Sequence, residues 1–513
     1  VDRESGGKRE TRGGAGTVFI TDSNTSQTSV RIDNLGVAGA LTTIPPEFTG
    51  SDVCVIAGRS SVIADHLLTF GECSVTGAST VAHTAGLADG LHINAGAMSI
   101  SSDSTLTGDA RGLSSSSGPG EGGDGVAASG GGYGGRGGFL GTFAGGASYG
   151  SVTNPTDLGS GGGRDTNNAA DGGRGGGRIR LSIGDTLTVD GAIEADGGSG
   201  TGADAGGGSG GSIVIDAGEI AGSGRVTADG GAGTGSGAGG SGGRIALTRS
   251  TNSFAGLVSA VGGGASTGTA RGGAGTIFSK APSDSLGDLS IFNSGVGAPT
   301  PLPEVFVAGD DGLISGGAIL QADHLVSFQT FAMTAGASIT HTAQSSSGLR
   351  LDVNGDMTID SGTVVNADGL GFPSSEGPGQ GGDGIAAGGA GHGGAGAGVG
   401  AVPGGPVYGD EFKPTQAGSG GGRDTNNATN GGAGGGIVRL NVGGILTVDG
   451  TIRANGRNGL GADAGGGSGG SVLISAGTLA GSGSIAAQGG LLAGAGGSGG
   501  GGRIAVYSCV VSL

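Results

Sequence analysis

The sequence predicts an all-β protein, a parallel β-helix (solenoid) with glycine-rich loops stacked beside its strands. Two observations predict it. Glycine makes up 133 of the 513 residues, yet short alternating apolar runs recur along the chain. These runs also repeat: segments beginning at Arg178, Ser212, Arg244 and Thr276 open with the same apolar pattern, and their starts are 34, 32 and 32 residues apart. A fixed period of this length indicates repeats that stack on one another.

Composition excludes the other glycine-rich classes. Collagen needs glycine at every third residue, and no such period is present. A disordered chain would lack the 34% of hydrophobic residues that fall in alternating runs typical of half-buried strands. Aromatic residues are only 3% and tryptophan is absent, so we expect a narrow core of valine, isoleucine, leucine and alanine. No segment combines a 3.6-residue period with capping signals, and we expect almost no helix.

Each short repeat, as we call a line of 32–34 residues, contains three apolar runs followed by a glycine tract. In the line that starts at Arg178 the runs are RIRLSI, TLTVDG and AIEADGG, with corners such as Asp190-Gly191. Asp-Gly supplies the positive φ of a tight turn. One line cannot bury its own apolar face, so we expect successive lines to stack in parallel at about 4.8 Å.

A longer repeat is superimposed on the short one. Arg164 and Arg423, Asp124 and Asp383, and Arg244 and Arg503 are each 259 residues apart in matching text. The sequence therefore predicts two tandem copies, 1–259 and 260–513. Each copy contains a glycine-rich excursion, 111–177 in the first and 370–436 in the second.

The glycine tracts admit two interpretations. They form flexible loops, or tracts at the same phase of successive repeats lie side by side as extended polyproline-II-like strands. Ordering glycine is entropically unfavourable, so the second arrangement requires many cooperating neighbours.

The pattern RIxL…LTVDGxIxAxGG…GGGSGG resembles the glycine-rich parallel β-helix segments of very large bacterial surface and adhesin-like proteins. The glycine tracts are similar to the polyproline-II bundles of glycine-rich phage tail-fibre adhesins. The first resemblance, to the bacterial surface proteins, covers about two thirds of the chain. It implies an exported, fibrous, non-catalytic protein and carries over no catalytic residue.

The charge of the chain limits the classes of partner that it can bind. The net charge is −18 and lysine occurs only at Lys8, Lys280 and Lys413, which argues against nucleic acid. No stretch of about 20 apolar residues is present, so we expect no transmembrane segment. The chain has neither an initial methionine nor a signal segment, and we interpret it as a piece of an exported protein located outside the cell or on its surface. Cys54 and Cys73 could pair in an oxidising compartment, and whether they do stays open.

The two ends of the chain complement each other in sequence. GGRIAVYSCVVSL at the C-terminus matches the start of the Arg244 repeat, and RGGAGTVF at 12–19 matches RGGAGTIF at 271–278. Open strand edges template further pairing. Either copies polymerise head to tail through this joint, or the chain is a slice of a longer tandem chain with the same geometry. The residues expected at the joint are Val1, Arg12, Thr17, Val18, Phe19, Arg503, Ile504, Val506, Tyr507, Cys509 and Leu513.

Two aspartates are candidate Ca²⁺ ligands. Asp124 and Asp383 lie in Gly-Gly-Asp-Gly, which is similar to calcium-binding glycine/aspartate repeats but lacks their tandem spacing. A turn-forming Asp-Gly is the alternative. Asp204 and Asp463, in GADAGGGSGG, are weaker candidates of the same kind.

Polysaccharide-active enzymes also use parallel β-helices, but no clustered set of acids and bases is evident. His66, His324, His83 and His341 recur between the copies without a second ligand at metal-binding spacing, and Asp65-His66 has no accompanying arginine or lysine cluster. We therefore expect no enzyme. The GGGRDTNNA segments are expected to hold the excursions on the shaft through Asp and Asn turn bonds.

The function that we predict is an extracellular structural protein whose solenoid shaft stacks head to tail into a filament. The alternative is an adhesin or tail-fibre-like protein that binds glycans or cell surfaces through its glycine-rich loops. Its candidate binding residues are Tyr133, Phe139, Phe143 and Tyr149. A polysaccharide-active enzyme is the remote alternative.

Overall fold

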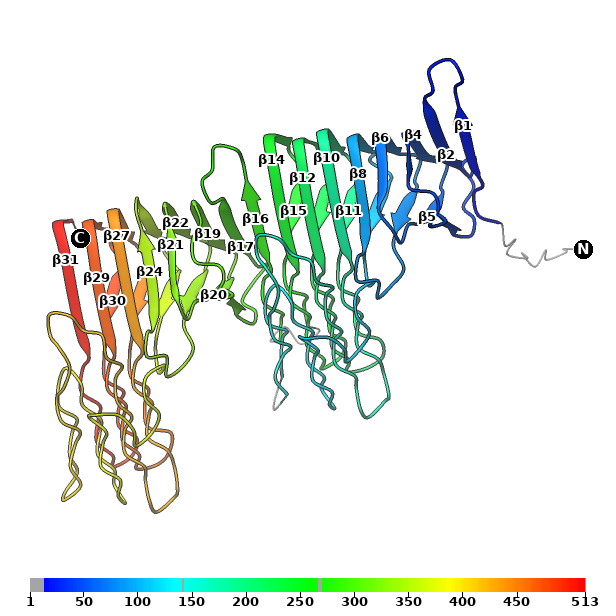
Figure 1. Cartoon of the computed structure of the whole chain (residues 1–513). Helices are drawn as coiled ribbons and strands as arrows, with labels where there is room; N and C mark the ends of the chain where they lie inside the picture. Colours follow the sequence, from blue (N-terminus) through cyan, green and yellow to red (C-terminus); the bar gives the residue numbers. More distant parts are fainter. Residues whose placement is uncertain (1–12, 141–142, 266–269, 513) are drawn as a thin grey trace, which may run out of the picture. The chain divides into compact units, whose positions relative to one another are not determined.

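The computed structural model describes residues 13–140, 143–265 and 270–512 (Figure 1). Within these residues there is no helix and 36% of the chain is in strands, so the all-β prediction is confirmed. The chain divides into two compact units, Val1–Asp284 and Ser285–Leu513. The predicted copies 1–259 and 260–513 were defined by sequence repetition, and the compact units divide the chain at a later position.

Unit 1 consists of two sets of strands. The long set is β1 (Thr17–Thr21), β2 (Thr28–Asp33), β4 (Gly50–Ala57), β6 (Leu68–Val75), β8 (Leu91–Ile100), β10 (Arg178–Val189), β12 (Ser212–Gly222), β14 (Arg244–Phe254) and β16 (Thr276–Lys280). The short set is β3 (Thr42–Thr43), β5 (Ser61–Ile63), β7 (Thr80–Ala82), β9 (Thr105–Thr107), β11 (Ala192–Glu194), β13 (Arg225–Thr227) and β15 (Leu257–Ser259).

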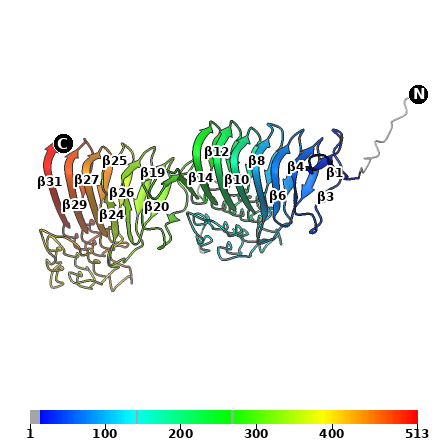
Figure 2. The same cartoon turned by 45° about the horizontal axis from the view of Figure 1, so that its top comes forward.

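Both sets of unit 1 are parallel sheets in chain order. From β2 to β16 each long strand pairs in parallel with the next. The short strands from β3 to β15 do the same. β1 differs, because it pairs antiparallel with β2. The long and short strands run as two neighbouring layers within the unit (Figure 2).

The register of the long sheet follows the short repeat. Arg178 pairs with Ser212, Ser212 with Arg244, and Arg244 with Thr276, which are the starts of the four lines. The expectation of three apolar runs per line is corrected in one respect. RIRLSI and TLTV belong to one strand, β10, whose pairing with β12 shifts register between Ile183 and Thr186. A bulge bends a strand without ending it, which the alternation of apolar residues alone does not reveal.

The core of unit 1 is narrow and aliphatic. Side chains that alternate along each strand point inward, and equivalent positions stack: Ile179, Ile213 and Ile245 are all fully buried. Val226 on β13 and Leu106 on β9 are buried from the opposite layer. Each strand therefore shields its neighbours, and an end strand is shielded on one side only.

Unit 2 repeats this arrangement. Its long strands are β17 (Asp288–Phe292), β19 (Asp311–Ser315), β21 (Leu325–Phe328), β22 (Thr330–Met333), β24 (Leu349–Val353), β25 (Met357–Ile359), β27 (Ile437–Val448), β29 (Ser471–Ala480) and β31 (Arg503–Ser512). Its short strands are β18 (Thr300–Pro301), β20 (Ile319–Gln321), β23 (Ser338–Thr340), β26 (Val364–Asn366), β28 (Thr451–Arg453) and β30 (Ser484–Ala486). The pairings within unit 2 are again parallel, and the last is β29 with β31.

The glycine tracts are ordered by hydrogen bonds between their backbones, and in each unit they extend from the strands on one side (Figure 1). The amides of Gly206, Gly207 and Gly208 donate to three different tracts, at the carbonyls of Gly163, Ala238 and Gly198. The next three residues, 209–211, donate to the same three tracts in the same order. Residues 465–470 of unit 2 follow the same scheme. The hydrogen bonding of a tract therefore repeats every three residues.

Close packing explains why these positions are glycine. A Cβ placed on Gly207 would lie 2.0 Å from the Gly231 carbonyl oxygen, and one on Gly240 would lie 2.0 Å from that of Gly208. No side chain can be accommodated at such distances without moving a neighbouring backbone.

The excursion of unit 1 runs across several tracts. Its segment 128–138 donates hydrogen bonds to the carbonyls of Gly207, Gly242 and Gly239, and its Arg136 carbonyl accepts from Gly273. These partners belong to three successive short repeats. The excursion is thus a hydrogen-bonded part of the glycine bundle, by which we mean the tracts of one unit together with its excursion.

Candidate functional site

The last long strand of unit 2 has one unpaired edge. β31 pairs with β29 and with no other strand in the described part of the chain. Apolar side chains on β31 are exposed: 43% of Ile504, 38% of Val506 and 54% of Val510. An edge of this kind offers unpaired amides and carbonyls to a further strand.

The equivalent strand of unit 1 is covered. β14 lies 259 residues before β31 in the sequence and pairs in parallel with β16 on its far side. Its Ile245 and Leu247 are 0% and 7% exposed, against 43% and 38% for their equivalents Ile504 and Val506. The added strand therefore accounts for the burial of an otherwise similar surface.

β1 resembles the strand that covers β14. Its sequence TVF corresponds to TIF of β16, and the preceding RGGAG is identical. One edge of β1 is used by β2. All five residues of β1 are exposed, with Val18 at 54% and Phe19 at 55%, although the Phe19 ring lies edge-on to Phe48 with 6.3 Å between centroids.

An arginine marks the same position in both units. Arg244 is 1% exposed, and its guanidinium donates to the Tyr149 carbonyl at 2.9 Å and to the Thr276 hydroxyl at 3.0 Å. Burial lowers the pKa of Arg244, and the Tyr133 ring lies 5.6 Å from its guanidinium carbon. Arg503 donates to the Tyr408 carbonyl at 2.9 Å but is only half-buried. The covering strand supplies the difference, because Thr276 belongs to β16.

The structure thus places the expected joint residues on two open edges. Thr17, Val18 and Phe19 lie on β1. The second group, on β31, is Arg503, Ile504, Val506, Tyr507 and Cys509, of which all but Arg503 are exposed. Val1, Arg12 and Leu513 lie outside the described residues.

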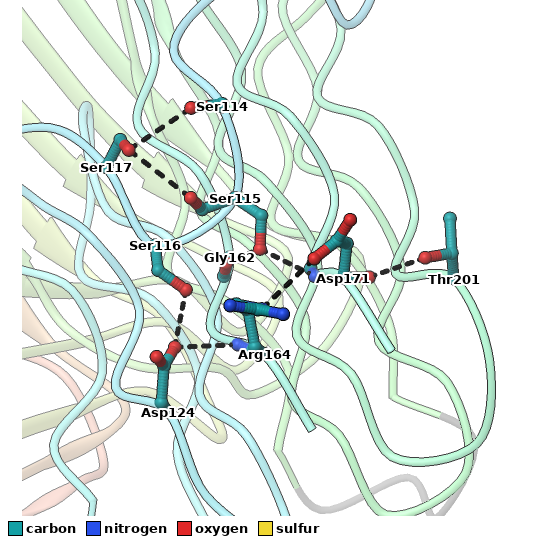
Figure 3. A network of polar contacts seen from close by, with 10 residues as sticks. Ser114, Ser115, Ser116, Ser117, Asp124, Gly162, Arg164, Asp171 and Thr201 are labelled. Atoms are coloured by element: carbon teal, nitrogen blue, oxygen red, sulfur yellow. Dashed lines mark hydrogen bonds and ion pairs between the residues drawn. The ribbon is translucent and has the colours of Figure 1, made fainter. Parts of the chain in front are cut away.

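The calcium candidates hold the excursions in place. Asp124 accepts hydrogen bonds from the Ser116 hydroxyl and from the Arg164 amide at 2.8 Å (Figure 3). Asp383 accepts from Ser375 and from the Arg423 amide at 2.8 Å. Asp204 and Asp463 accept backbone amides of the following short repeat. Among the described residues, none of these four aspartates belongs to a group of three carboxylate, histidine or cysteine side chains that could hold a metal ion. Calcium binding by them stays a prediction.

Sequence reasoning missed a group of acids. Oxygens of Asp109, Glu194 and Asp196 lie within 4.8 Å of one another, beside Asp229 of the next repeat. Burial and the carboxylates of Asp229 and Asp109 raise the pKa of Asp196 to about 7. The signal was available, because Asp196 and Asp229 sit at the same phase of successive lines and equal phase means vertical stacking.

The proposed aromatic binding surface needs correction. Tyr133 is fully buried, with its hydroxyl 2.6 Å from that of Ser212 and its ring 4.7 Å from Tyr149. Tyr149 is mostly buried as well, and its hydroxyl donates to the Leu158 carbonyl. A phenol within a bundle of small residues fills space and satisfies buried polar atoms. Phe139 and Phe143 remain exposed, at 54% and 40%.

The recurring histidines have backbone partners. The Nε2 atoms of His66 and His324 lie 2.7 and 2.8 Å from the carbonyls of Phe48 and Phe306. Burial lowers the pKa of His83 and of His341. Asp65 accepts from Thr84 in the next repeat at 2.7 Å, and Asp323 accepts from Thr342. His66 thus bonds to the repeat before it and Asp65 to the repeat after it.

Cys54 and Cys73 are in-register partners on β4 and β6, and both are buried free thiols. A hydrogen bond with Cys54, together with burial, raises the pKa of Cys73. Cys509 is exposed on β31.

No helix in the described part of the chain could span a membrane. No protein-family model, no curated protein and no solved structure matches this chain.

Proposed function

We propose that this chain is an extracellular structural protein, a β-solenoid shaft whose copies stack end to end into a fibre. The observation that carries the proposal is the difference between β31 and β14. In the described part of the chain no strand pairs with the far edge of β31, whereas the same edge of β14 is covered by β16. The first residues of β16, Thr-Ile-Phe, correspond to Thr-Val-Phe of β1, whose described pairing uses one edge only. A heterologous contact generates an open filament whenever successive copies do not close into a ring.

The solenoid is the finer fold that we infer. In its support, the short repeats that start at Arg178, Ser212 and Arg244 each contribute one long and one short strand, and these strands pair in parallel with the matching strands of the neighbouring repeat. The inward-facing residues of both layers share one core.

We further infer that the glycine tracts are stacked polyproline-II-like strands. Their hydrogen bonds change partner with a three-residue period, and polyproline II has three residues per turn. They belong to neither helix nor strand, and most of their residues have no positive φ.

The test is assembly of the purified chain. Electron microscopy and sedimentation over a range of concentrations should show uniform fibres that lengthen with concentration. Because the Arg503 amide donates to the carbonyl of Gly470, the residue before β29, alternation puts the amide of Val506 on the side of β31 that faces away from β29. Val506→Pro should remove this donor without removing a bond to β29, and it should leave the protein monomeric.

A matched control separates assembly from folding. The melting temperature of monomeric Val506→Pro should stay near that of the wild type at concentrations below assembly. Wild-type protein that remains a short isolated rod at all concentrations would overturn the fibre.

Surface binding through the excursions is a second candidate, which the exposure of Phe139 and Phe143 favours. A glycan array tests it: retention that is lost in Phe139→Ala and Phe143→Ala supports a binding protein, and an array without any retained glycan contradicts glycan binding.

A further inference from the structure

The glycine bundle of unit 1 holds a tract at a position that no described residue fills in unit 2. In unit 1 the amides of Gly239 and Gly242 donate to the carbonyls of Ala270 and Gly273. Their equivalents in unit 2 are Ser498 and Gly501, and the described part of the chain contains no backbone acceptor for either amide. Gly242 is buried, whereas Gly501 is exposed.

Space at this position is open as well. A Cβ on Gly135 would lie 2.2 Å from the Ala274 carbonyl oxygen. A Cβ on the equivalent Gly394 would meet nothing closer than 3.6 Å. The Arg136 carbonyl accepts from Gly273, and its equivalent, the Ala395 carbonyl, accepts no backbone hydrogen bond from the described residues.

The segment 13–19 has the residues that such a position requires. GGAGT at 13–17 is identical to GGAGT at 272–276, the stretch that fills this position in unit 1 and leads into β16. The stretch 272–275, which fills the position in unit 1, contains only glycine and one alanine, and 13–16 has the same residues. Small residues are what such close backbone packing requires.

We propose that the glycine tract of a second copy of this chain completes the bundle of unit 2, in one fixed register. Gly14 of the second copy then lies beside Gly394, its amide donating to the Ala395 carbonyl and its carbonyl accepting from Gly501. The following strand pairs as β16 does on β14, so that Thr17 lies opposite Arg503 and Val18 opposite Ile504. The inference rests on the proposed function and deepens it by naming the site and its occupant.

Arg503 is the positioning residue of this joint. In unit 1 the guanidinium of Arg244 donates a hydrogen bond to the Thr276 hydroxyl, which belongs to the covering strand β16. The Thr17 hydroxyl of the second copy takes that role for Arg503. A one-residue slip would present the Val18 side chain instead, leaving a buried cation without this acceptor, so the arginine selects the register.

The test compares substitutions that leave the isolated chain intact. Gly394→Ala places a methyl group in space that is open in the monomer and filled in the joint. We expect an unchanged monomer melting temperature and an assembly concentration raised at least tenfold. Gly184→Ala is the matched control, because its Cβ would also meet nothing closer than 3.8 Å and it lies far from the joint in the sequence. It should assemble like the wild type.

Two further readouts test register and burial. In a Cys509→Ser background, Phe19→Cys and Ala505→Cys chains are mixed and treated with a short bifunctional thiol reagent. The reagent should join them, because β14 and β16 pair Ala246 with Phe278, whose equivalents are Ala505 and Phe19. The shifted mixture, Phe19→Cys with Ser508→Cys, should be joined much less. Hydrogen exchange of the segment 498–506 should slow on assembly.

The outcomes separate the two proposals. If the wild type forms no fibres, the proposed function fails. If fibres form but Gly394→Ala and Arg503→Ala assemble like the wild type, or the shifted mixture is the one joined, the glycine joint is wrong and the fibre stands.

Discussion

The two units form the same stack of side-chain-to-backbone hydrogen bonds with different side chains. In unit 1, Asp109, Asp196 and Asp229 stack along successive repeats, and each accepts the backbone amide of the next. At the equivalent places unit 2 has Asp368, Asn455 and Gln488, and Asp368 and Asn455 make the same bonds to the next amide. The backbone bond recurs in both units although Asn455 and Gln488 replace two of the three carboxylates, so an amide oxygen at Asn455 serves as acceptor as the Asp196 carboxylate does.

A second contrast concerns covering. β14 and β31 are similar in sequence, but their equivalent residues differ in exposure. Gly135 and Gly394 are also equivalent, but only Gly135 has another backbone close to it. The difference arises from what lies next to them. Substitutions at matched positions can therefore measure the contribution of one neighbouring strand or tract.

The largest expected difference is at the glycine pair. Gly135→Ala forces a methyl group against the Ala274 carbonyl, and we expect it to lower the free energy of unfolding of unit 1 by about 3 kcal/mol. Gly394→Ala should change unit 2 by less than about 0.5 kcal/mol. Urea unfolding followed by hydrogen exchange in each unit measures both. Equal losses of stability in Gly135→Ala and Gly394→Ala would show that the neighbouring backbone can shift to accommodate a methyl group at little cost.

The arginine pair should come next. Arg244→Met leaves the Tyr149 carbonyl and the Thr276 hydroxyl without their buried donor, and should destabilise unit 1 by about 2 kcal/mol. Arg503→Met, which loses one bond at a half-buried site, should destabilise monomeric unit 2 by about 1 kcal/mol. The same urea experiment applies. A larger loss at Arg503 than at Arg244 contradicts the idea that the covering strand gives this residue its importance.

The stacked acids should make unit 1 sensitive to pH. The pKa of Asp196 is raised to about 7 from an ordinary value near 4. Between these values the folded chain holds a proton that the unfolded chain has released. The contribution of Asp196 to stability is therefore fully present below about pH 4 and is lost as the pH rises through 7. Between pH 5.5 and 8 this loss is about 2 kcal/mol.

Substitution of one residue in each unit checks this pH effect. Asp196→Asn should flatten the melting profile of unit 1 between pH 5.5 and 8, and Asn455→Asp should introduce a downward slope into unit 2. A wild-type unit 1 whose melting temperature is constant over this range would exclude the raised pKa.

The smallest effect is expected where the units agree. Asp124→Ala and Asp383→Ala each remove an acceptor for the Arg164 or Arg423 amide, and each should cost about 1 kcal/mol in its own unit. Calcium should be added to the same melts. A rise in wild-type melting temperature that both variants abolish would establish these aspartates as ligands.

Much of the fold could be predicted because its information is periodic. Starts 32–34 residues apart predicted the register Arg178–Ser212–Arg244–Thr276, since parallel stacking converts a sequence period directly into pairing. The joining of RIRLSI and TLTV into one strand was not predictable, because a bulge preserves the alternation on either side. The burial of Tyr133 was not predictable for another reason: its hydrogen-bond partners Ser212 and Ser241 lie 79 and 108 residues away in the sequence, and no neighbouring residue indicates them.

The excursion determines which length of sequence can be duplicated. A lone stack of short repeats would accept one more repeat anywhere, since every repeat meets the same neighbours. Here segment 128–138 is hydrogen-bonded to tracts from three successive repeats, so an inserted line would separate partners that one stretch of chain must reach. Recombination within the gene should therefore be tolerated in steps of about 259 residues and selected against in steps of 32. That is a reason for the close similarity of the two long copies, when the short lines within each copy have diverged.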